Sequence, residues 1–397
     1  MIPLKTAISI VDEKIGGRRV PTEKIPVREA VGRILAADQF SKVDLPPFDK
    51  SAMDGYAVLE GDQHSRLRIE GVVTAGDPGT DKLLPGTTVK VMTGAPVPPG
   101  TARVVIVEEA VEEDGHVRFE NPSPASNICK KAEDVAVGDR ILKAGVRLGA
   151  LEISNLISCG IGDIDVARPV SVAVISTGDE LVDSFSNLSR GKIMNSNGPM
   201  LQELARKFSM TVTSEVSVTD EPSKLTAVIQ QALREADMVV LSGGVSAGDF
   251  DFVPQAIEEA GLQIHFSRVA IKPGKPVTFA TNENGILFGL PGNPVSVFLT
   301  FHLFVLHAAA RLSGASYEPK TFNIRLANDY TRRSGERMVY VPCRITSDGF
   351  AEPVIYHGSA HLAALMQAEG FLIIPIGVRS MTSGAEVPLV MFGSRFG

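Results

Sequence analysis

SVAVISTGDE, residues 171–180, decides the fold of this chain. Its first part is a short run of apolar, mostly β-branched residues, which predicts a buried strand. The run ends in a polar loop that contains Gly178, Asp179 and Glu180. A buried strand that leads into such a loop is typical of a parallel sheet, where ligands bind beyond the carboxyl ends of the strands.

The same pattern continues through the middle of the chain. Further strands are predicted at Thr211–Val218, Met238–Leu241 and Ile286–Leu290. Helices are predicted from Asn197 to Phe208 and from Pro222 to Ala236, each with a proline in its first turn. Strands that alternate with helices predict a doubly wound, parallel α/β domain.

The regions on either side differ from the α/β domain in composition and in hydrophobic pattern. Residues 46 to about 140 are rich in Gly, Pro, Val and Thr, and short strand-like runs such as Thr88–Met92 predict a mostly β module. Leu151–Cys159 predicts a short helix. Near the C-terminus, alternating runs such as Met338–Ile345 predict a small β domain with one helix at about His361–Glu369.

Length, charge and cysteine content narrow the class of protein. A chain of 397 residues is too long for one core, so two or more domains are expected. The net charge of −7 disfavours nucleic-acid binding, which requires a basic face. Three widely spaced cysteines argue against disulfides or a thiolate zinc site and favour a reducing, cytoplasmic location. The N-terminus predicts an amphipathic helix rather than a signal peptide, and the apolar segment Val295–Leu312 predicts a core helix rather than a membrane span.

Three polar, glycine-rich loops follow the first, third and fourth predicted strands of the α/β domain. Free backbone N–H groups in such loops favour phosphates and other oxyanions. A tight turn explains any single loop equally well, but three together favour a continuous binding rim. None of them is a Walker A loop, since no Gly-Lys-Ser/Thr follows. The candidate ligand-binding residues of the three loops are Gly178, Asp179, Ser242, Gly243, Gly244, Ser246, Gly248, Asp249, Pro291, Gly292, Asn293 and Pro294.

Charged residues of both signs lie near these loops. Lys272 and Lys275 flank a rigid turn and could clamp an oxyanion, although a solvated turn is the alternative. Carboxylates are the ligands that Mg²⁺ prefers when it also binds substrate phosphates. Asp220 could instead cap the helix that begins at Pro222. The carboxylates near the loops are Asp179, Glu180, Asp220, Asp249 and Asp251.

Six motifs, in order along nearly the whole chain, resemble the molybdopterin molybdenumtransferases, the MoeA-type enzymes whose eukaryotic counterpart is the gephyrin E domain. Six motifs in a fixed order make a specific resemblance. They are PPFDKSAMDGYA (46–57), MTGAPVP (92–98), STGDELV (176–182), SGGVSAGD (242–249), IKPGKP (271–276) and GLPGNPVS (289–296).

The resemblance implies an elongated subunit of four domains. Residues 1–45 and 141–167 would form a discontinuous first domain, and 46–140 an inserted β-rich second domain. Residues 168–316 would form the α/β molybdopterin-binding domain, and 317–397 a C-terminal β domain. The family forms homodimers, so the active site is expected at the interface between two subunits.

The implied reaction inserts molybdenum from molybdate into adenylylated molybdopterin and releases AMP, with Mg²⁺ assisting. Lys272 and Lys275 would bind an oxyanion, Ser359 matches a functional serine, and other proteins of the same pathway are expected partners. The implied catalytic residues are Asp54, Thr93, Asp134, Glu180, Asp220 and Asp251, of which Glu180, Asp220 and Asp251 would bind the metal.

Two departures from the family pattern concern basic residues. Val341 stands where many relatives have an arginine, which puts the oxyanion contact of the C-terminal domain in doubt. Lys130 and Lys131 replace arginines before Asp134, which keeps the charge but loses bidentate geometry.

Two other functions stay open at this point. The first is an adenylyltransferase of the same pathway, but such an enzyme would not need the N-terminal 150 residues or the C-terminal domain. The second is a gephyrin-like scaffold without activity. An apolar groove between the α/β and C-terminal domains would support it, whereas the rim of carboxylates and lysines favours an enzyme.

Overall fold

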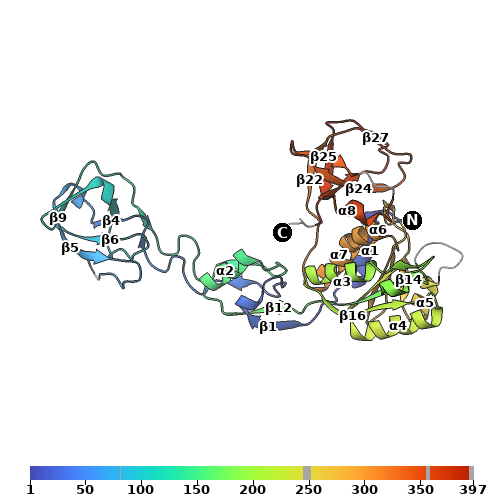
Figure 1. Cartoon of the computed structure of the whole chain (residues 1–397). Coiled ribbons are helices and arrows are strands. Elements are labelled where there is room, and N and C mark those ends of the chain that lie inside the picture. Colours follow the sequence, from blue (N-terminus) through green and yellow to red (C-terminus); the bar gives the residue numbers. More distant parts are fainter. Residues whose placement is uncertain (81, 245–251, 355–357, 393–397) are drawn as a thin grey trace.

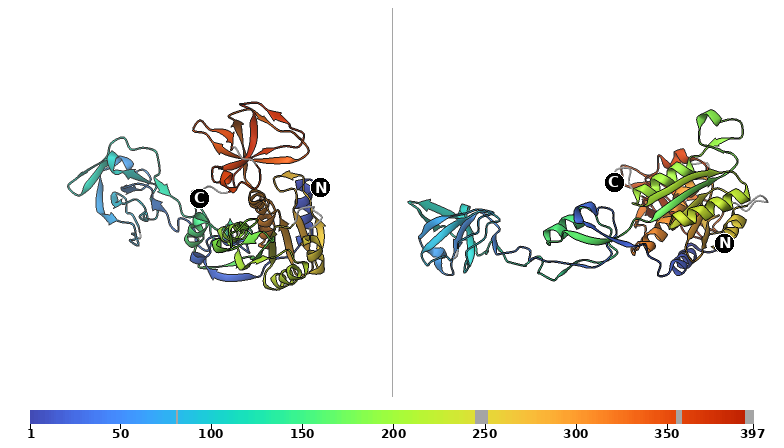
Figure 2. Two further views of the ribbon diagram at one scale, coloured as in Figure 1. Left: turned by 45° about the vertical axis from the view of Figure 1, so that its right-hand side comes forward. Right: turned by 90° about the horizontal axis from the view of Figure 1, so that it is seen from below.

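The computed structural model describes residues 1–80, 82–244, 252–354 and 358–392. The chain is elongated, with a β module at one end and an α/β body at the other, joined by a narrow arm (Figure 1). A C-terminal β domain packs on the body. Two further views also show the β module apart from the body (Figure 2).

The body is built around a sheet of six strands in the order β16-β13-β17-β21-β20-β18. The four strands predicted from the sequence are the parallel ones, β16, β13, β17 and β21. The remaining two, β20 and β18, are antiparallel and were not predicted. In chain order the strands are β13 (Ser171–Thr177), β16 (Thr211–Val218), β17 (Met238–Ser242), β18 (Gln263–Phe266), β20 (Thr278–Thr281) and β21 (Ile286–Leu290).

Strand β13 is buried along its whole length because helices cover both faces of the sheet. Val172 and Val174 belong to the core on one face, and Ala173 and Ile175 to the core on the other. The first core includes residues of α1, α3, α6 and α7, and the second includes residues of α4 and α5. The helices are α1 (Leu4–Ile15), α3 (Asn197–Lys207), α4 (Pro222–Glu235), α5 (Val253–Glu259), α6 (Pro294–Thr300) and α7 (Leu306–Leu312).

The segment Pro294–Leu312 is long and apolar enough to cross a membrane by length and composition alone, but 78% of its most apolar part is buried inside the protein. A single turn of π-helix, Phe301–Val305, joins α6 to α7 within it. This is the arrangement of a core helix.

The first 45 residues contribute to two different cores. Helix α1 packs with α7 in the core of the body. The next strand, β1 (Thr22–Pro26), pairs with β12 (Asp163–Ala167) in the arm. Together with α2 (Ala150–Ser158), this pair encloses a small core of its own, which includes Leu156 and Ile164.

Two further sheets of six strands lie outside the body. The β module has the order β7-β4-β6-β5-β9-β8, and the C-terminal domain has the order β19-β24-β25-β22-β28-β26. The helix predicted at His361–Glu369 covers only Leu362–Leu365 (α8). The strands are β4 (Gly55–Val58), β5 (Leu67–Val73), β6 (Thr87–Val91), β7 (Arg103–Ile106), β8 (Ala110–Glu113), β9 (His116–Phe119), β19 (Ile271–Lys272), β22 (Thr321–Leu326), β24 (Met338–Ile345), β25 (Phe350–Pro353), β26 (Gly370–Ile374) and β28 (Glu386–Val390).

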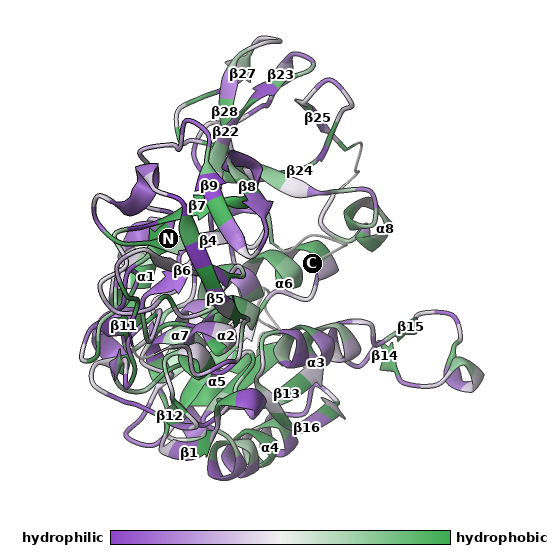
Figure 3. Ribbon diagram, turned by 90° about the vertical axis from the view of Figure 1, so that its left-hand side faces the viewer, coloured by the Kyte–Doolittle hydropathy of each residue, from purple (hydrophilic) through white to green (hydrophobic). Residues whose placement is uncertain are grey.

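Between β13 and α3 the chain projects away from the body and returns (Figure 3). The base of this projection is the parallel pair β14 (Leu181–Val182) and β15 (Ile193–Met194). The amide of Ile193 donates to the carbonyl of Glu180 at 2.8 Å, which returns the chain close to the point where it left the sheet. As a consequence, α3 begins beside the carboxyl ends of the central strands.

Asp237 joins the starts of β13 and β17. Its carboxylate accepts hydrogen bonds from Arg168 at 2.8 and 3.0 Å, and from the amide and hydroxyl of Ser171 at 2.7 and 2.6 Å. Burial raises the pKa of Asp237, but these hydrogen bonds outweigh it and hold the pKa below its ordinary value.

We expect Asp237→Asn to lower the free energy of unfolding by about 2 kcal/mol at pH 7, because charged hydrogen bonds to a partly buried group are lost. Since the folded-state pKa is lowered, this stabilisation is present above about pH 4 and is lost as the pH falls further. Urea unfolding of both proteins at pH 7, 5 and 3 measures it. A difference that is as large at pH 3 as at pH 7 would contradict the role of the charge.

Candidate functional site

The described parts of the three glycine loops lie along one edge of the sheet, because β13, β17 and β21 are neighbours and end on the same side. The amide of Gly243 donates to the carbonyl of Leu290 at 3.3 Å, which ties the second loop to the third. A Cβ at Gly243 would lie 2.1 Å from the carbonyl oxygen of Thr177, so the second loop also packs directly on the first. The described residues of the three loops are therefore in contact, as a common rim requires.

Asn197, which the sequence analysis missed, links two of the loops. Its side-chain amide donates to the hydroxyl of Ser242 at 2.9 Å and to the carbonyl of Gly292 at 2.7 Å. Its Oδ1 is buried and has no partner within the described part of the chain. A buried polar atom without a partner is costly, so Oδ1 marks a place where a ligand could donate a hydrogen bond.

The acidic side of the rim centres on Asp220. Its carboxylate accepts from the hydroxyl of Thr177 at 2.7 Å, and its amide donates to the carboxylate of Asp179 at 3.1 Å. The alternative that Asp220 caps a helix is wrong, because the N-cap of α4 is Glu221. Glu180 is exposed, and its carboxylate has no partner among the residues described.

These carboxylates are compatible with Mg²⁺. Within the described ranges, no three His, Cys, Asp or Glu side chains lie close enough together to hold a metal ion by themselves. Mg²⁺ does not need such a cage, because it keeps several waters and takes one or two carboxylates together with substrate phosphates. Glu180 and Asp220 each place a carboxylate at the ends of these strands.

The C-terminal domain adds Ser359 to the rim. The side-chain amide of Asn293 donates to the Ser359 hydroxyl at 2.8 Å, and the amide of Val295 donates to the Ser359 carbonyl at 3.1 Å. These contacts fix Ser359 beside the third loop at the start of α6. The structure thus unites Ser359 with Pro291, Gly292, Asn293 and Pro294.

Strand β19 carries Lys272 onto the C-terminal sheet by pairing with β24. Lys272 lines a hollow of about 300 Å³ with Arg332, Arg333 and Arg337. Arg332 donates to three backbone carbonyls of its own domain. In the part of the chain that the structure describes, the side chains of Lys272, Arg333 and Arg337 have no such partner. The C-terminal domain therefore presents free cations beside Lys272 although Val341 is not an arginine. Lys275 is exposed on the same turn.

The remaining candidate residues lie at the other end of the molecule. Asp54 accepts hydrogen bonds from the amide and the hydroxyl of Thr93 at 2.7 and 2.8 Å. These hydrogen bonds lower the pKa of Asp54 and keep it ionised. Asp134 is exposed in a loop, and its own backbone amide donates to the carbonyl of Leu45. The β module is separated from the body by the arm (Figure 1), so a single chain does not bring these residues to the rim.

Four predicted residues fall outside the described part of the chain. They are Ser246, Gly248, Asp249 and Asp251.

Three family descriptions match consecutive parts of the chain. "MoeA N-terminal region (domain I and II)" matches residues 2–160, "Probable molybdopterin binding domain" matches 173–311, and "MoeA C-terminal region (domain IV)" matches 323–392. A molybdopterin molybdenumtransferase of Haemophilus influenzae is 35% identical over 95% of each chain. One from Staphylococcus aureus is 32% identical over 98% of this chain and 95% of its own. The chain belongs to the molybdopterin molybdenumtransferase family.

The fold is also that of a solved structure. The crystal structure of a molybdopterin biosynthesis MoeA protein from Pyrococcus horikoshii superposes with a TM-score of 0.85 at 29% identity, covering 99% of this chain and all of that one.

Membership of the molybdopterin molybdenumtransferase family bears on both alternative functions. The matches include the N-terminal and C-terminal regions, which an adenylyltransferase would not need. The apolar groove expected for a scaffold is present: Leu204, Phe298, Leu365 and Phe371 line a hollow of about 400 Å³ between the body and the C-terminal domain. None of the residues that line it is a catalytic or substrate-binding candidate, so the groove is compatible with an enzyme as well.

Proposed function

We propose that this protein is a molybdenum-cofactor biosynthesis enzyme that inserts molybdenum from molybdate into adenylylated molybdopterin and releases AMP. The observation that supports this most directly is that three strand-end loops and Ser359 meet at one rim, in a chain that also groups Lys272 with arginines of the C-terminal domain and matches a family member over 98% of its length. Both substrates are polyanions, and the chain provides glycine-rich loops at the strand ends together with unpaired cations in the hollow beside Lys272.

The residues of the rim and those of the cationic hollow have distinct tasks in this proposal. Asn197 accepts a hydrogen bond from the substrate through its free Oδ1, and the glycines allow close approach of the phosphates. Lys272, Lys275 and Arg337 neutralise negative charge, which cleavage of a pyrophosphate requires more than a protein nucleophile. Glu180, Asp220 and Asp251 would bind Mg²⁺. The bound ion would neutralise further charge on the phosphates.

The proposal includes a homodimer with shared active sites. Asp54, Thr93 and Asp134 lie away from the rim of their own chain. In a two-fold symmetric dimer, the β module of one subunit can lie against the body of the other. Each site would then combine the rim of one chain with Asp54 and its neighbours from the partner. We further propose a cytoplasmic location, where other proteins of the pathway would supply the adenylylated substrate.

A reconstitution tests the reaction. Purified protein is mixed with adenylylated molybdopterin, Mg²⁺ and molybdate, and AMP release and molybdenum retained on the pterin are followed together. We expect AMP release that depends on molybdate. Absence of both signals from a folded dimer would reject the proposal in favour of a scaffold, and formation of adenylylated molybdopterin from ATP would indicate the adenylyltransferase.

Arg337 provides a separate test of the cationic hollow. We expect Arg337→Ala to raise the KM of the reaction about tenfold with a smaller change in kcat, since a charged contact to a bound anion is lost. Arg344→Ala is the matched control, because Arg344 lies on β24, the strand that begins directly after Arg337, but pairs with Glu352 outside the hollow. Equal effects of the two substitutions would show that Arg337 does not contact the substrate.

A further inference from the structure

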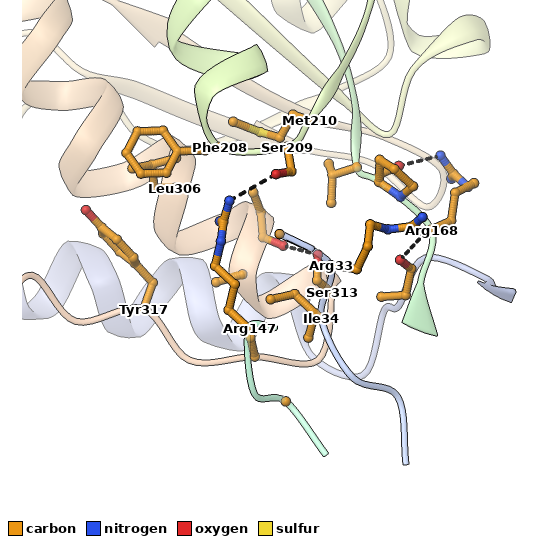
Figure 4. Close-up of a pocket in the computed structure, with 18 of the residues that line it drawn as sticks. Arg33, Ile34, Arg147, Arg168, Phe208, Ser209, Met210, Leu306, Ser313 and Tyr317 are labelled. Atoms are coloured by element: carbon orange, nitrogen blue, oxygen red, sulfur yellow. Dashed lines mark hydrogen bonds between the residues drawn. The ribbon is translucent and has the colours of Figure 1, made fainter. Parts of the chain in front are cut away.

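A second cavity lies where the arm meets the body, away from the rim. It has a volume of about 160 Å³. Its walls come from both chain segments of the arm, from the link between β12 and β13, from the corner after α3, and from α7 with the segment that follows it. Figure 4 shows Arg147 between Tyr317 and Arg33, with its guanidinium directed at Ser209.

The described residues that line this cavity include three arginines and no carboxylate. Two of them have acidic partners outside the lining: Arg33 pairs with Glu23, and Arg168 pairs with Asp237. Arg147 donates only to the hydroxyl of Ser209, at 3.0 Å, and has no carboxylate partner among the described residues.

Arg33 has hydrogen-bonding capacity left as well. Its Nε is buried and has no partner in the described ranges of the chain. The cavity therefore has an uncompensated positive charge at Arg147 and an unused donor at Arg33. Both features favour an anion, because an oxyanion can accept from two guanidinium groups at once.

The wall opposite the arginines is apolar. Phe208 and Leu306 lie there, and the ring of Tyr317 closes one side (Figure 4). Burial raises the pKa of Tyr317 to about 12, so its hydroxyl stays protonated and able to donate. A cavity of roughly 150 Å³ is large enough for benzene. The ligand that fits is thus a small molecule in which an oxyanion group is attached to an apolar part about as large as one aromatic ring.

The backbone keeps this space open. Gly32 has a φ of +80°, and a Cβ there would lie 2.8 Å from the hydroxyl oxygen of Ser209 and 3.7 Å from a guanidinium nitrogen of Arg147. Ser209 itself has a φ of +60°, which is uncommon for a residue other than glycine. Ser209, which accepts a hydrogen bond from the guanidinium, and Gly32, which leaves room beside it, thus both adopt a backbone conformation with positive φ.

We propose that this cavity, lined by Arg147, Arg33 and Tyr317, is a binding site for a small organic anion that is separate from the substrate rim. A ligand there contacts the arm, the body and the start of the C-terminal domain together. Its binding would therefore fix the arm relative to the body. In the dimer proposed above, this would also fix the position of the β module against the partner subunit.

The test is isothermal titration calorimetry on the full-length protein with benzoate, with its neutral analogue benzamide, and with inorganic phosphate. We expect benzoate to bind at least about tenfold more tightly than benzamide, because only benzoate can pair with Arg147. Phosphate should bind more weakly than benzoate, because it has no apolar part for the wall at Leu306.

Four variants locate the binding. Arg147→Gln should weaken benzoate binding about tenfold or more, and Ala310→Leu should weaken it by filling the cavity without changing its charge. Arg118→Gln is the matched control, since Arg118 is an exposed arginine on the distant β9. Lys272→Ala should still bind benzoate, which separates this site from the rim. Equal binding of benzamide, loss of binding in Lys272→Ala, or unchanged binding in both Arg147→Gln and Ala310→Leu would overturn the proposal, as would absence of binding to the wild-type protein.

Discussion

Alanine at Asp54 or at Asp220 should each lower the rate of molybdenum insertion by a factor of about 10²–10³, the scale expected when one preorganised charged or polar contact to the reacting group is removed. Asp54 lies in the β module and Asp220 at the rim of the body. If each active site combines two subunits, a mixture of the two inactive variants should regain activity. The reason is that a mixed dimer has one site with both carboxylates and one with neither.

The recovery has an expected size. Random exchange of subunits gives about half mixed dimers, each with one intact site of two, so about a quarter of the wild-type rate should return. The measurement is the rate of molybdate-dependent AMP release after co-refolding or co-expression of the two variants. A site that lies within one chain predicts no recovery.

A second mixture is the control. Glu180 and Asp220 belong to the same rim, so a mixed dimer of Glu180→Ala and Asp220→Ala has no intact site. It should stay as inactive as its parents. Recovery in this mixture would show that the two carboxylates do not serve the same site.

The sequence predicted the parts of the fold that depend on local pattern. β13, β17 and β21 were predicted because parallel strands covered on both faces are continuous apolar runs. β16, at the edge of the sheet, was predicted because it is rich in valine and threonine. β18 and β20 were missed because their sequences, QIHF and TFAT, mix polar and apolar residues and lie close to turns. The packing of α1 on α7 could not be predicted from local sequence patterns either, because it joins segments almost 300 residues apart.

The candidate site shows the same division. Ser242, Gly243 and Gly292 follow predicted strands, so the order of the loops was enough to place them together. Asn197 follows the projecting segment, and its contact with Ser242 depends on where that segment returns to the sheet. Nothing in an Asn-Gly-Pro helix start distinguishes such a role from an ordinary turn.

Gly243→Ala should cause the largest loss of stability of any glycine-to-alanine substitution in the described part of the rim. Gly243 has a φ of +102°, and an added Cβ would lie 2.1 Å from the carbonyl oxygen of Thr177 and 3.2 Å from its carbonyl carbon. Both contacts are with the backbone of the neighbouring strand, so no side chain can move aside. Backbone strain and overpacking together predict a loss of about 3 kcal/mol or more in the free energy of unfolding.

Gly261→Ala separates the two causes of that loss. Gly261 also has a positive φ, of +86°, but an added Cβ there would meet nothing within 4 Å. It should therefore show the cost of the backbone conformation alone, about 1 kcal/mol. Urea unfolding of both variants measures the difference. If they lose equal stability, Gly243 matters only for its conformation. If Gly243→Ala loses much more, close contact between the first and second loops is what requires glycine, and the rim is held together by direct packing of its backbones.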